Sequence, residues 1–237
     1  MPSGNKPKIS VVIPVYNQAH LISNAINSIL NQTFQDFEIV IVDDGSTDNI
    51  KETVGKFKDE RIRLINQEHM GLVVARNFGN YCSRADVVAI QDADDLSMPD
   101  RLEKCYKAIE EGADVVYHGA YINMWDSTLN CIGRKYLPAD QPDRKRLLEG
   151  QYIPGWPMFR KKVWEQKRFR LETQYAYDWM MYLDWLFSNF KFKAINEGLY
   201  EYVRHENSAS INFEKLGWRQ GSMQKIKTIM KEEYEQS

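Results

Sequence analysis

The sequence alternates short apolar runs, rich in β-branched residues, with segments whose apolar residues recur at helical spacing. The first run is Ile9 to Val15 (ISVVIPV), and the second is Phe37 to Val42 (FEIVIV). Uninterrupted apolar runs of this length are typical of strands that are buried on both faces. Strands that alternate with helices in this way indicate βαβ units. The pattern therefore predicts an α/β fold with a Rossmann-like, mostly parallel sheet flanked by helices.

The same alternation predicts the other elements of the first half of the chain. The expected strands cover residues 9–15, 37–42, 62–65, 86–90 and 115–120, and the expected helices cover residues 21–30, 50–57, 72–81 and 99–111. After about residue 121 the alternation is lost among aromatic residues and prolines. There we expect a helix over 179–190, strands over 192–195 and 199–204, and a terminal helix over 213–234.

The composition shows no linker, so we predict a single domain over residues 1–237. Its expected parts are a first half (8–120), a mixed second half (121–212) and a C-terminal helix (213–237). Hydrophobic residues make up 43% of the chain, which suits a sizeable core and excludes intrinsic disorder. The 31 basic and 33 acidic residues give a formal net charge of −2, and we therefore expect no nucleic-acid partner.

Two further features concern the compartment. Residues 1–8 lack the apolar segment of a secretory signal, and no apolar run approaches the ~20 residues that span a bilayer. Cys82, Cys105 and Cys131 are isolated in the sequence, and we interpret them as reduced thiols of the core. We expect a cytoplasmic protein, which would reach any lipid-linked substrate from the inner face of the membrane.

Polar side chains follow three of the predicted strands, at the sheet edge where open α/β folds bind their ligands. Tyr16 and Asn17 follow the first strand. Carboxylates follow the second strand and the strand over 86–90: Asp43, Asp44, Asp48, Asp92, Asp94 and Asp95. These groups would repel one another unless a cation or hydrogen-bond donors offset their charge, and a hard divalent cation takes such oxygen ligands. The same residues also suit turns and helix caps, so a structural role stays open.

The glycine motifs of other nucleotide-binding sheets are absent. Neither GxxxxGK[ST] nor GxGxxG occurs in the sequence. The phosphates of a nucleotide would therefore be neutralised by a metal and not by a glycine-rich loop. This separates the chain from P-loop NTPases and from dinucleotide-dependent dehydrogenases.

Four ordered motifs resemble those of one enzyme family. VVIPVYN, QTFQDFEIVIVDDGSTD, GLVVARN and DADDLSMPDRL resemble the inverting family-2 glycosyltransferases of the GT-A fold, over about residues 8–210. The resemblance implies that the first half binds a nucleotide sugar through Pro14, Tyr16, Asn17, Asp43, Asp44, Arg76 and Asp92. It further implies that Asp94, the last residue of the Asp-x-Asp motif, is the chief ligand of a divalent metal, Mn²⁺ or Mg²⁺.

The resemblance also assigns roles in the second half. Asp178 stands where the family places its general base, although Tyr177 replaces the usual acidic neighbour. We expect Asp184, six residues later, to be a solvated helix residue. His205 matches a histidine that lies near the metal and the diphosphate. Trp156 and Trp179 are candidates for stacking on an acceptor sugar, with core packing as an equally good alternative.

The C-terminal helix carries apolar residues beside several lysines. It could lie on an anionic membrane or pack its apolar side on the domain, and packing is the favoured interpretation. Processive members of the family carry a QxxRW motif, whereas Trp218-Arg219-Gln220 has a different order here. We therefore expect a non-processive enzyme.

These features together predict a metal-dependent inverting glycosyltransferase. It would move a sugar from a nucleotide sugar, a UDP-sugar, to a hydroxyl of a saccharide or lipid-linked acceptor in polysaccharide or glycolipid assembly. Two alternatives stay open: a sugar-1-phosphate nucleotidyltransferase and a non-catalytic carbohydrate-binding module of the same fold. The first would be expected to carry a glycine-rich, basic loop after the first strand, which residues 16–20 do not provide.

Overall fold

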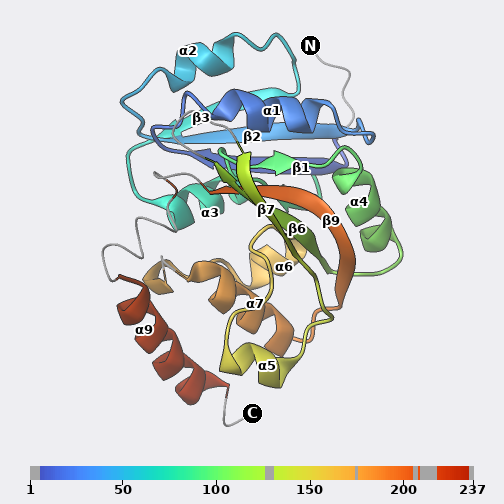
Figure 1. Ribbon diagram of the computed structural model, residues 1–237, viewed down its shortest axis with the longest axis vertical. Coiled ribbons are helices and arrows are strands. Elements are labelled where there is room, and N and C mark those ends of the chain that lie inside the picture. The colour runs from blue at the N-terminus through green and yellow to red at the C-terminus, as the bar shows by residue number, and fades with distance from the viewer. Residues whose placement is uncertain (1–5, 126–130, 174–175, 205–207, 209–217, 235–237) are drawn as a thin grey trace.

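The computed structural model describes residues 6–125, 131–173, 176–204, 208 and 218–234 (Figure 1). Its centre is a mixed sheet of β1 (Ile9–Val15), β2 (Phe37–Asp44), β3 (Ile62–Gln67), β4 (Val87–Ile90), β5 (Leu96–Ser97), β6 (Val115–Trp125), β7 (Cys131–Leu137), β8 (Met158–Arg160) and β9 (Phe192–Arg204). The strand order is β3-β2-β1-β4-β8-β6-β9-β5, and β7 pairs with β6. β1 to β4 are mutually parallel, and β6 runs parallel to β9, whereas β5, β7 and β8 pair antiparallel with their neighbours.

Helices cover both faces of this sheet. They are α1 (Ile22–Leu30), α2 (Ile50–Gly55), α3 (Leu72–Cys82), α4 (Arg101–Glu110), α5 (Arg144–Glu149), α6 (Lys161–Gln166), α7 (Tyr177–Phe187) and α9 (Trp218–Glu233), with a 3₁₀ turn, η1, at Leu171–Thr173. Alternate residues of β1 enter different cores, because successive side chains of a strand point to opposite faces. Val11 and Ile13 pack with α1, α2 and α4, while Val12 packs with α3. The uninterrupted apolar run of β1 is thus explained by burial on both faces.

Glycine lets α3 lie close against the sheet. A Cβ atom at Gly79 would come within 2.4 Å of a Val12 methyl group, so a larger residue would push the helix away from β1. α3 carries Arg76, whose position relative to the end of β4 depends on this close packing. The helix that begins with the GLVVARN segment therefore packs closely on β1 and carries Arg76, one of the predicted nucleotide-binding residues.

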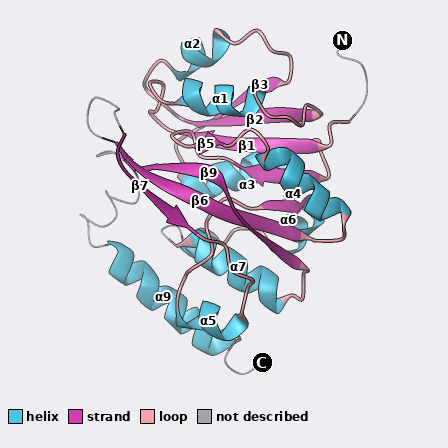
Figure 2. Ribbon diagram, turned by 45° about the vertical axis from the view of Figure 1, so that its right-hand side comes forward, coloured by secondary structure: helices cyan, strands magenta, loops and turns pink. Residues whose placement is uncertain are grey.

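The second half departs from the expected elements. Residues 192–204 form the single strand β9, so the prediction of separate strands over 192–195 and 199–204 is wrong. Asn196, Glu197 and Gly198 stay within the strand because the β6–β9 ladder shifts register around Gly119 and accommodates the interruption. β6 continues past residue 120 to Trp125, and no pattern in the sequence predicts β7, β8, α5 or α6. Figure 2 shows β6, β7 and β9 as long adjoining strands.

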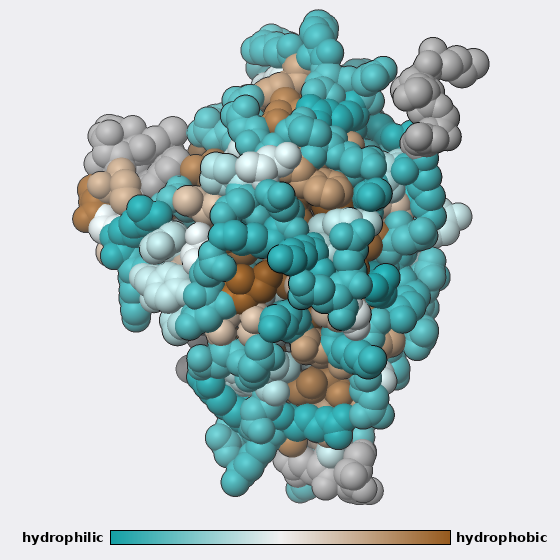
Figure 3. Space-filling model, turned by 90° about the vertical axis from the view of Figure 1, so that its right-hand side faces the viewer, coloured by the Kyte–Doolittle hydropathy of each residue, from teal (hydrophilic) through white to brown (hydrophobic). Residues whose placement is uncertain are grey.

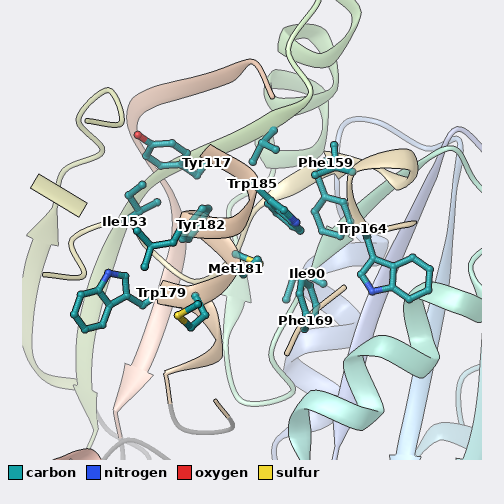
Figure 4. Packing of buried hydrophobic residues seen from close by; sticks show 14 of the residues in the cluster. Ile90, Tyr117, Ile153, Phe159, Trp164, Phe169, Trp179, Met181, Tyr182 and Trp185 are labelled. Carbon is teal, nitrogen blue, oxygen red and sulfur yellow. The ribbon is translucent and has the colours of Figure 1, made fainter. Parts of the chain in front are cut away.

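Aromatic residues of α7 fill the core between this part of the sheet and the C-terminal helix. Trp179, Tyr182 and Trp185 are buried and lie near Tyr117 and Phe159 (Figure 4). The helix begins two residues before the predicted start and ends at 187, three residues before the predicted end. The residues of α7 from Trp179 to Trp185, directly after Asp178, are therefore buried in the core.

The described part of α9 packs its apolar side on this core. Ile226, Met230 and Tyr234 are buried in the same cluster as α7, which confirms the packing interpretation for these residues. Residues 213–217 of the predicted helix lie outside the described residues. Within the part of the chain that the structure describes, no helix combines the length and the apolar character needed to cross a membrane.

The surface and the cysteines give two smaller results. One face of the molecule is mostly hydrophilic, with apolar areas that are small and separate (Figure 3).

Cys105 is buried as expected, whereas Cys82 is half-buried and Cys131 is exposed on β7. The interpretation of Cys131 as a core thiol is therefore wrong, because β7 has only one covered edge and an exposed burial pattern.

Candidate functional site

The loops that follow β1, β2 and β4 meet at one edge of the sheet, as their parallel pairing requires. Asn17 adopts a left-handed conformation with φ of 54° and accepts a 2.8 Å hydrogen bond from the Thr47 amide. The Asn17 amide donates to Ser46 Oγ at 3.0 Å. Gln18 Nε2 donates to Asp94 Oδ2 at 3.2 Å, which joins the first loop to the third. The predicted convergence of the three strand ends is thus observed.

Asp44 is buried at this edge and accepts hydrogen bonds with both carboxylate oxygens. Oδ1 accepts from Gln67 Nε2 at 2.6 Å and from the Met70 amide at 2.9 Å. Oδ2 accepts from the Gly71 amide at 2.9 Å and lies 2.9 Å from His69 Nδ1. The loop before α3 therefore wraps around the Asp44 carboxylate.

One oxygen of each of the other carboxylates of the second loop accepts a hydrogen bond from a main-chain amide. Asp43 Oδ1 accepts from the Ser46 amide at 2.9 Å, and Asp48 Oδ2 accepts from the Ala19 amide at 2.8 Å. These are the turn and loop contacts that the sequence left open as an alternative. Hydrogen bonds from main-chain amides therefore offset part of the charge of Asp43, Asp44 and Asp48, while Asp48 Oδ1 is buried without a hydrogen-bond partner.

Two further predicted nucleotide contacts lie on β1 and just after it. Pro14 is buried within β1. Tyr16 is 42% exposed, and its ring stacks on the imidazole of His69, with ring centroids 3.9 Å apart and an interplanar angle of 20°. The sequence does not mark His69 as a candidate, because no local pattern distinguishes it from an exposed loop histidine. Only its contacts with Tyr16 and Asp44 reveal it.

Asp92, at the end of β4, is held by residues from both halves of the chain. Its Oδ1 accepts a hydrogen bond from Arg76 Nη2, and its Oδ2 accepts from Trp156 Nε1 at 2.9 Å. Its main-chain amide donates to the Tyr200 hydroxyl at 3.0 Å. Arg76 is only 1% exposed, and it pairs with Asp92 rather than with the Asp44 loop. Arg76 also carries two buried guanidinium nitrogens, Nε and Nη1, without a hydrogen-bond partner.

The remaining carboxylates of the Asp-x-Asp segment differ in environment. Asp94 is half-buried. Asp95 is fully buried, and its Oδ1 accepts from the Val203 amide at 2.8 Å, which ties the segment to β9. Burial, reinforced by the nearby charges of Asp94 and Asp92, raises the pKa of Asp95 well above its usual value. Asp95 is thus a structural link between the two halves.

The described residues contain no group of three His, Cys, Asp or Glu side chains arranged to hold a metal. His205, the other predicted metal ligand, lies outside the described residues. Asp94 and Asp92 still offer carboxylate oxygens, the donors that Mg²⁺ and Mn²⁺ prefer. Asp94, the predicted metal ligand, would therefore suit such a cation, with Asp92 close by.

A buried arginine that the sequence did not single out supports this part of the site. Arg101, fully buried at the start of α4, donates from Nη2 to the main-chain oxygens of Ile90 at 2.7 Å and Trp156 at 3.2 Å. Its Nε donates to Nε2 of His118 at 2.9 Å. Burial, with the adjacent Arg101 charge, lowers the pKa of His118 to about 3, so the imidazole is a neutral acceptor. Arg101 therefore holds the end of β4 to the Trp156 loop.

Asp178 lies in the first turn of α7, close to the Arg76 guanidinium. Its Oδ2 accepts from Gln151 Nε2, and its Oδ1 accepts from the Trp179 amide at 3.0 Å. Burial of the carboxyl raises its pKa, while the Gln151 hydrogen bond and the Arg76 charge act in the opposite direction. Tyr177 packs its ring 4.5 Å from the Arg76 guanidinium. An aromatic face thus meets the arginine here.

Gly155 leaves room for this carboxylate. A Cβ atom at residue 155 would lie 3.1 Å from Asp178 Oδ2, closer than most real contacts of a Cβ atom. The neighbouring Pro154 carbonyl is fixed by a 2.6 Å hydrogen bond from the buried Tyr182 hydroxyl. The loop before β8 therefore determines where the Asp178 carboxylate can lie.

The two tryptophans proposed for acceptor stacking have different environments. Trp156 is 7% exposed beside Asp92 and stacks on Tyr200 at 4.5 Å, so it borders the site. Trp179 is fully buried and donates from Nε1 to the Leu147 carbonyl at 2.7 Å. The prediction that Trp179 stacks on an acceptor sugar is wrong and the core-packing alternative holds, because the side chain is fully buried.

Asp184 is not the solvated residue that we expected. It is 3% exposed, and Arg170 donates to both of its oxygens at 2.6 and 2.8 Å. The Tyr234 hydroxyl donates to Oδ1 at 2.5 Å. Asp184 therefore connects α7 to the segments around η1 and the end of α9. Of the two α7 carboxylates, Asp178 is the one near Arg76.

Comparison with known proteins bears on this geometry. The model of the family described as "Glycosyl transferase family 2" matches residues 10–184. An uncharacterized glycosyltransferase of Rickettsia conorii is 42% identical over 118 residues, which is 49% of this chain and 20% of that protein. Glycosyltransferase GlyG of Streptococcus pneumoniae is 39% identical over 126 residues, which is 52% of this chain and 42% of that protein. The matched segments thus span less than half the length of these relatives.

Solved structures confirm the expected fold. The structure of S. aureus TarS 1–349 in complex with UDP-GlcNAc is similar with a TM-score of 0.67 at 20% identity, over 86% of this chain and 60% of that chain. The complex of the same TarS fragment with UDP gives a TM-score of 0.64 at 21% identity, over 84% and 61% of the two chains. The predicted α/β fold of the GT-A type, with a mostly parallel sheet flanked by helices, is therefore confirmed.

Proposed function

The chain belongs to glycosyl transferase family 2, and we propose that it transfers a sugar from a UDP-sugar to a hydroxyl of a saccharide or lipid-linked acceptor, with inversion. The observation that best supports this proposal is the position of the Arg76 guanidinium. It pairs with Asp92 at the end of β4 and lies near Asp178 at the start of α7. Arg76 thus pairs with a carboxylate of the donor half and packs on Tyr177, the residue next to the candidate base Asp178.

The proposed donor rests on the exposed edge of the sheet and on the structural relatives. Tyr16 and Asp44 offer an aromatic face and a carboxylate, which suit a nucleobase with ring N–H groups. TarS, whose fold is similar, has been crystallised with UDP-GlcNAc. UDP-sugars are therefore the first donors to test.

Asp178 is the proposed general base. In a single displacement the acceptor oxygen attacks the anomeric carbon opposite the leaving diphosphate, and a carboxylate oxygen of Asp178 takes the acceptor proton. A raised pKa makes a carboxylate a stronger proton acceptor, and burial raises that of Asp178. Gln151 and Gly155 fix the orientation of the carboxylate.

A divalent cation, Mn²⁺ or Mg²⁺, is the proposed cofactor, with Asp94 as its chief protein ligand, and Asp92 is proposed to reach the donor sugar or ribose. Bound at Asp94, the cation would stabilise negative charge on the diphosphate. Because the described residues offer few ligands in one place, the cation should bind tightly only with the nucleotide. His205 is proposed to approach the same phosphates.

Contact with a membrane is proposed through the exposed side of α9. Lys225, Lys227 and Lys231 are exposed, while Ile226 and Met230 of the same helix are buried in the core. Any such contact would therefore be electrostatic, with anionic lipids, and would weaken as salt is added. Vesicle sedimentation at low and high salt tests it.

The proposed function is tested by release of UDP from a panel of UDP-sugars with simple saccharide acceptors. Asp178→Asn should lower kcat by about 10²–10⁴-fold with the Kd for UDP unchanged. The control is Asp86→Asn, since Asp86 is 85% exposed and lies outside the site. Equal turnover by Asp178→Asn and the control would show that Asp178 is not the base.

A further inference from the structure

His69 makes the two contacts that a nucleobase would make at this edge of the sheet. Its imidazole stacks on Tyr16 at 3.9 Å, and its Nδ1 lies 2.9 Å from Asp44 Oδ2 and 3.1 Å from the Asp44 main-chain oxygen. Both neighbours of Nδ1 are acceptors, so Nδ1 carries the proton. A flat ring with one N–H group therefore already covers the aromatic face and bonds the carboxylate.

The Asp44 carboxylate has no vacant acceptor position while His69 lies there. A carboxylate offers about four lone-pair sites, and Gln67, His69, Met70 and Gly71 each occupy one. Two of these donors are main-chain amides, and Gln67 is half-buried. His69 is the most easily displaced of the four, since its side chain is 52% exposed.

The main chain of His69 is fixed, so the ring can leave only by rotating its side chain. Gly45 has φ of +75°, and a Cβ atom there would lie 2.7 Å from the His69 main-chain nitrogen. The two following residues donate their amides to Asp44. The loop is therefore held on both sides of His69, and rotation of an exposed side chain is a low-barrier motion.

We propose that His69 is a side-chain cover that occupies the nucleobase position when no donor is bound and rotates away when a nucleotide binds. This inference rests on the proposed function. A pyrimidine with a ring N–H group would replace the imidazole one for one, stacking on Tyr16 and donating to Asp44. Uracil fits this exchange, whereas cytosine has no N–H at the corresponding ring position. His69 thereby acts as a competitor that lowers the apparent affinity for every nucleotide using this position.

The size of the effect follows from the fraction of molecules in which the ring is displaced. The apparent Kd equals the intrinsic Kd divided by the fraction of the competent state. If the ring covers the position about nine-tenths of the time, removing it lowers the Kd by about tenfold. The effect should be confined to ligands that carry a base.

The test is calorimetric titration of the wild-type chain and His69→Ala with UDP, and with inorganic pyrophosphate as a probe without a base. His69→Ala should bind UDP about tenfold more tightly and pyrophosphate as the wild type does. Met70→Ala is the matched control, because Met70 is a 59% exposed neighbour whose contact with Asp44 is made by its amide. The control should bind UDP like the wild type.

Each other outcome overturns the inference. Weaker binding of UDP by His69→Ala would make His69 a stacking platform, and unchanged binding would make it irrelevant to the base. Equal tightening for pyrophosphate would place the effect away from the base. If the wild-type chain binds UDP in any of these cases, the proposed function survives. If neither protein binds UDP, ADP, GDP or CDP, the proposed function fails together with the inference.

Discussion

The contact between Arg170 and Asp184 gives the sharpest test of how the second half is held together. Arg170 lies just before η1, and its guanidinium donates to both oxygens of the buried Asp184 and to both oxygens of Glu233 on α9. Arg170→Met removes the cation but keeps much of its aliphatic volume. The Asp184 carboxylate would then be buried with the Tyr234 hydroxyl as its remaining partner among these contacts.

The cost of this change can be estimated from burial. Removing one partner of a buried ion pair destabilises a protein by about 3–5 kcal/mol. The Arg170 side chain is 19% exposed, which favours the lower end, about 3 kcal/mol. For a domain of this size, each 1 kcal/mol lowers Tm by about 2–4 °C, so the expected decrease is roughly 6–12 °C.

The measurement is thermal unfolding followed by circular dichroism, with Arg146→Met as the matched control. Arg146 pairs with Asp140, but both side chains are about half exposed, so that pair should contribute no more than about 1 kcal/mol. Arg170→Met combined with Asp184→Leu should recover part of the lost stability, since no buried charge then remains unpaired. A decrease in Tm for Arg170→Met no larger than that of the control would refute the assignment of a buried pair.

Four further predictions concern the site and the sheet. Gly155→Ala should lower kcat by about tenfold with the Kd for UDP unchanged, because the new methyl group displaces the Asp178 carboxylate; equal turnover would contradict that contact. Burial raises the pKa of Asp178, so the acid-side fall of kcat should occur at a higher pH than for an exposed carboxylate, whose pKa is about 4. Asp178→Asn should not show this acid-side fall. Chelation of divalent cations should abolish sugar transfer, and Mn²⁺ titrated calorimetrically should bind tightly only when UDP is present. Burial acts to raise the pKa of Glu38, but hydrogen bonds from Ser10 and the Arg84 amide and the ion pair with Arg63 hold that pKa below its usual value. The stability that the ionised Glu38 contributes is therefore lost as pH falls through the lowered pKa. Glu38→Gln lacks this contribution, so its Tm should decrease less than that of the wild type between pH 6 and pH 3.

The first half of the fold could be predicted from the sequence because its signals are local. β1, β2 and β4 are largely apolar runs, β3 is a shorter strand of mixed residues, and all neighbours among these four strands are parallel. Parallel pairing brings the strand ends to one edge, so strand periodicity alone places the loops with Asn17, Asp44 and Asp92 together. The order of the four motifs also indicates the correct family.

The second half could not be predicted in the same way because its contacts are remote in the sequence. β9 stays continuous through two polar residues and a glycine, 196–198, only because β6 shifts register beside it. The exposed side of β7 carries no apolar pattern that would mark a strand. Trp179 and Asp184 lie on one helix with Asp178, and nothing local shows that the first two face the core.

By itself, then, the sequence determined which side chains reach the edge of the sheet, since strand periodicity and parallel pairing dictate where each strand ends. Only the tertiary structure decided what those side chains do there. Asp44 is enclosed by the loop before α3, Asp92 is shared between Arg76 and Trp156, and His69 covers the position next to Tyr16. The physical reason is that the protonation and hydrogen bonding of a carboxylate depend on all the donors and charges around it. Here the donors lie up to 108 residues away in the chain, as the Val203 amide does from Asp95.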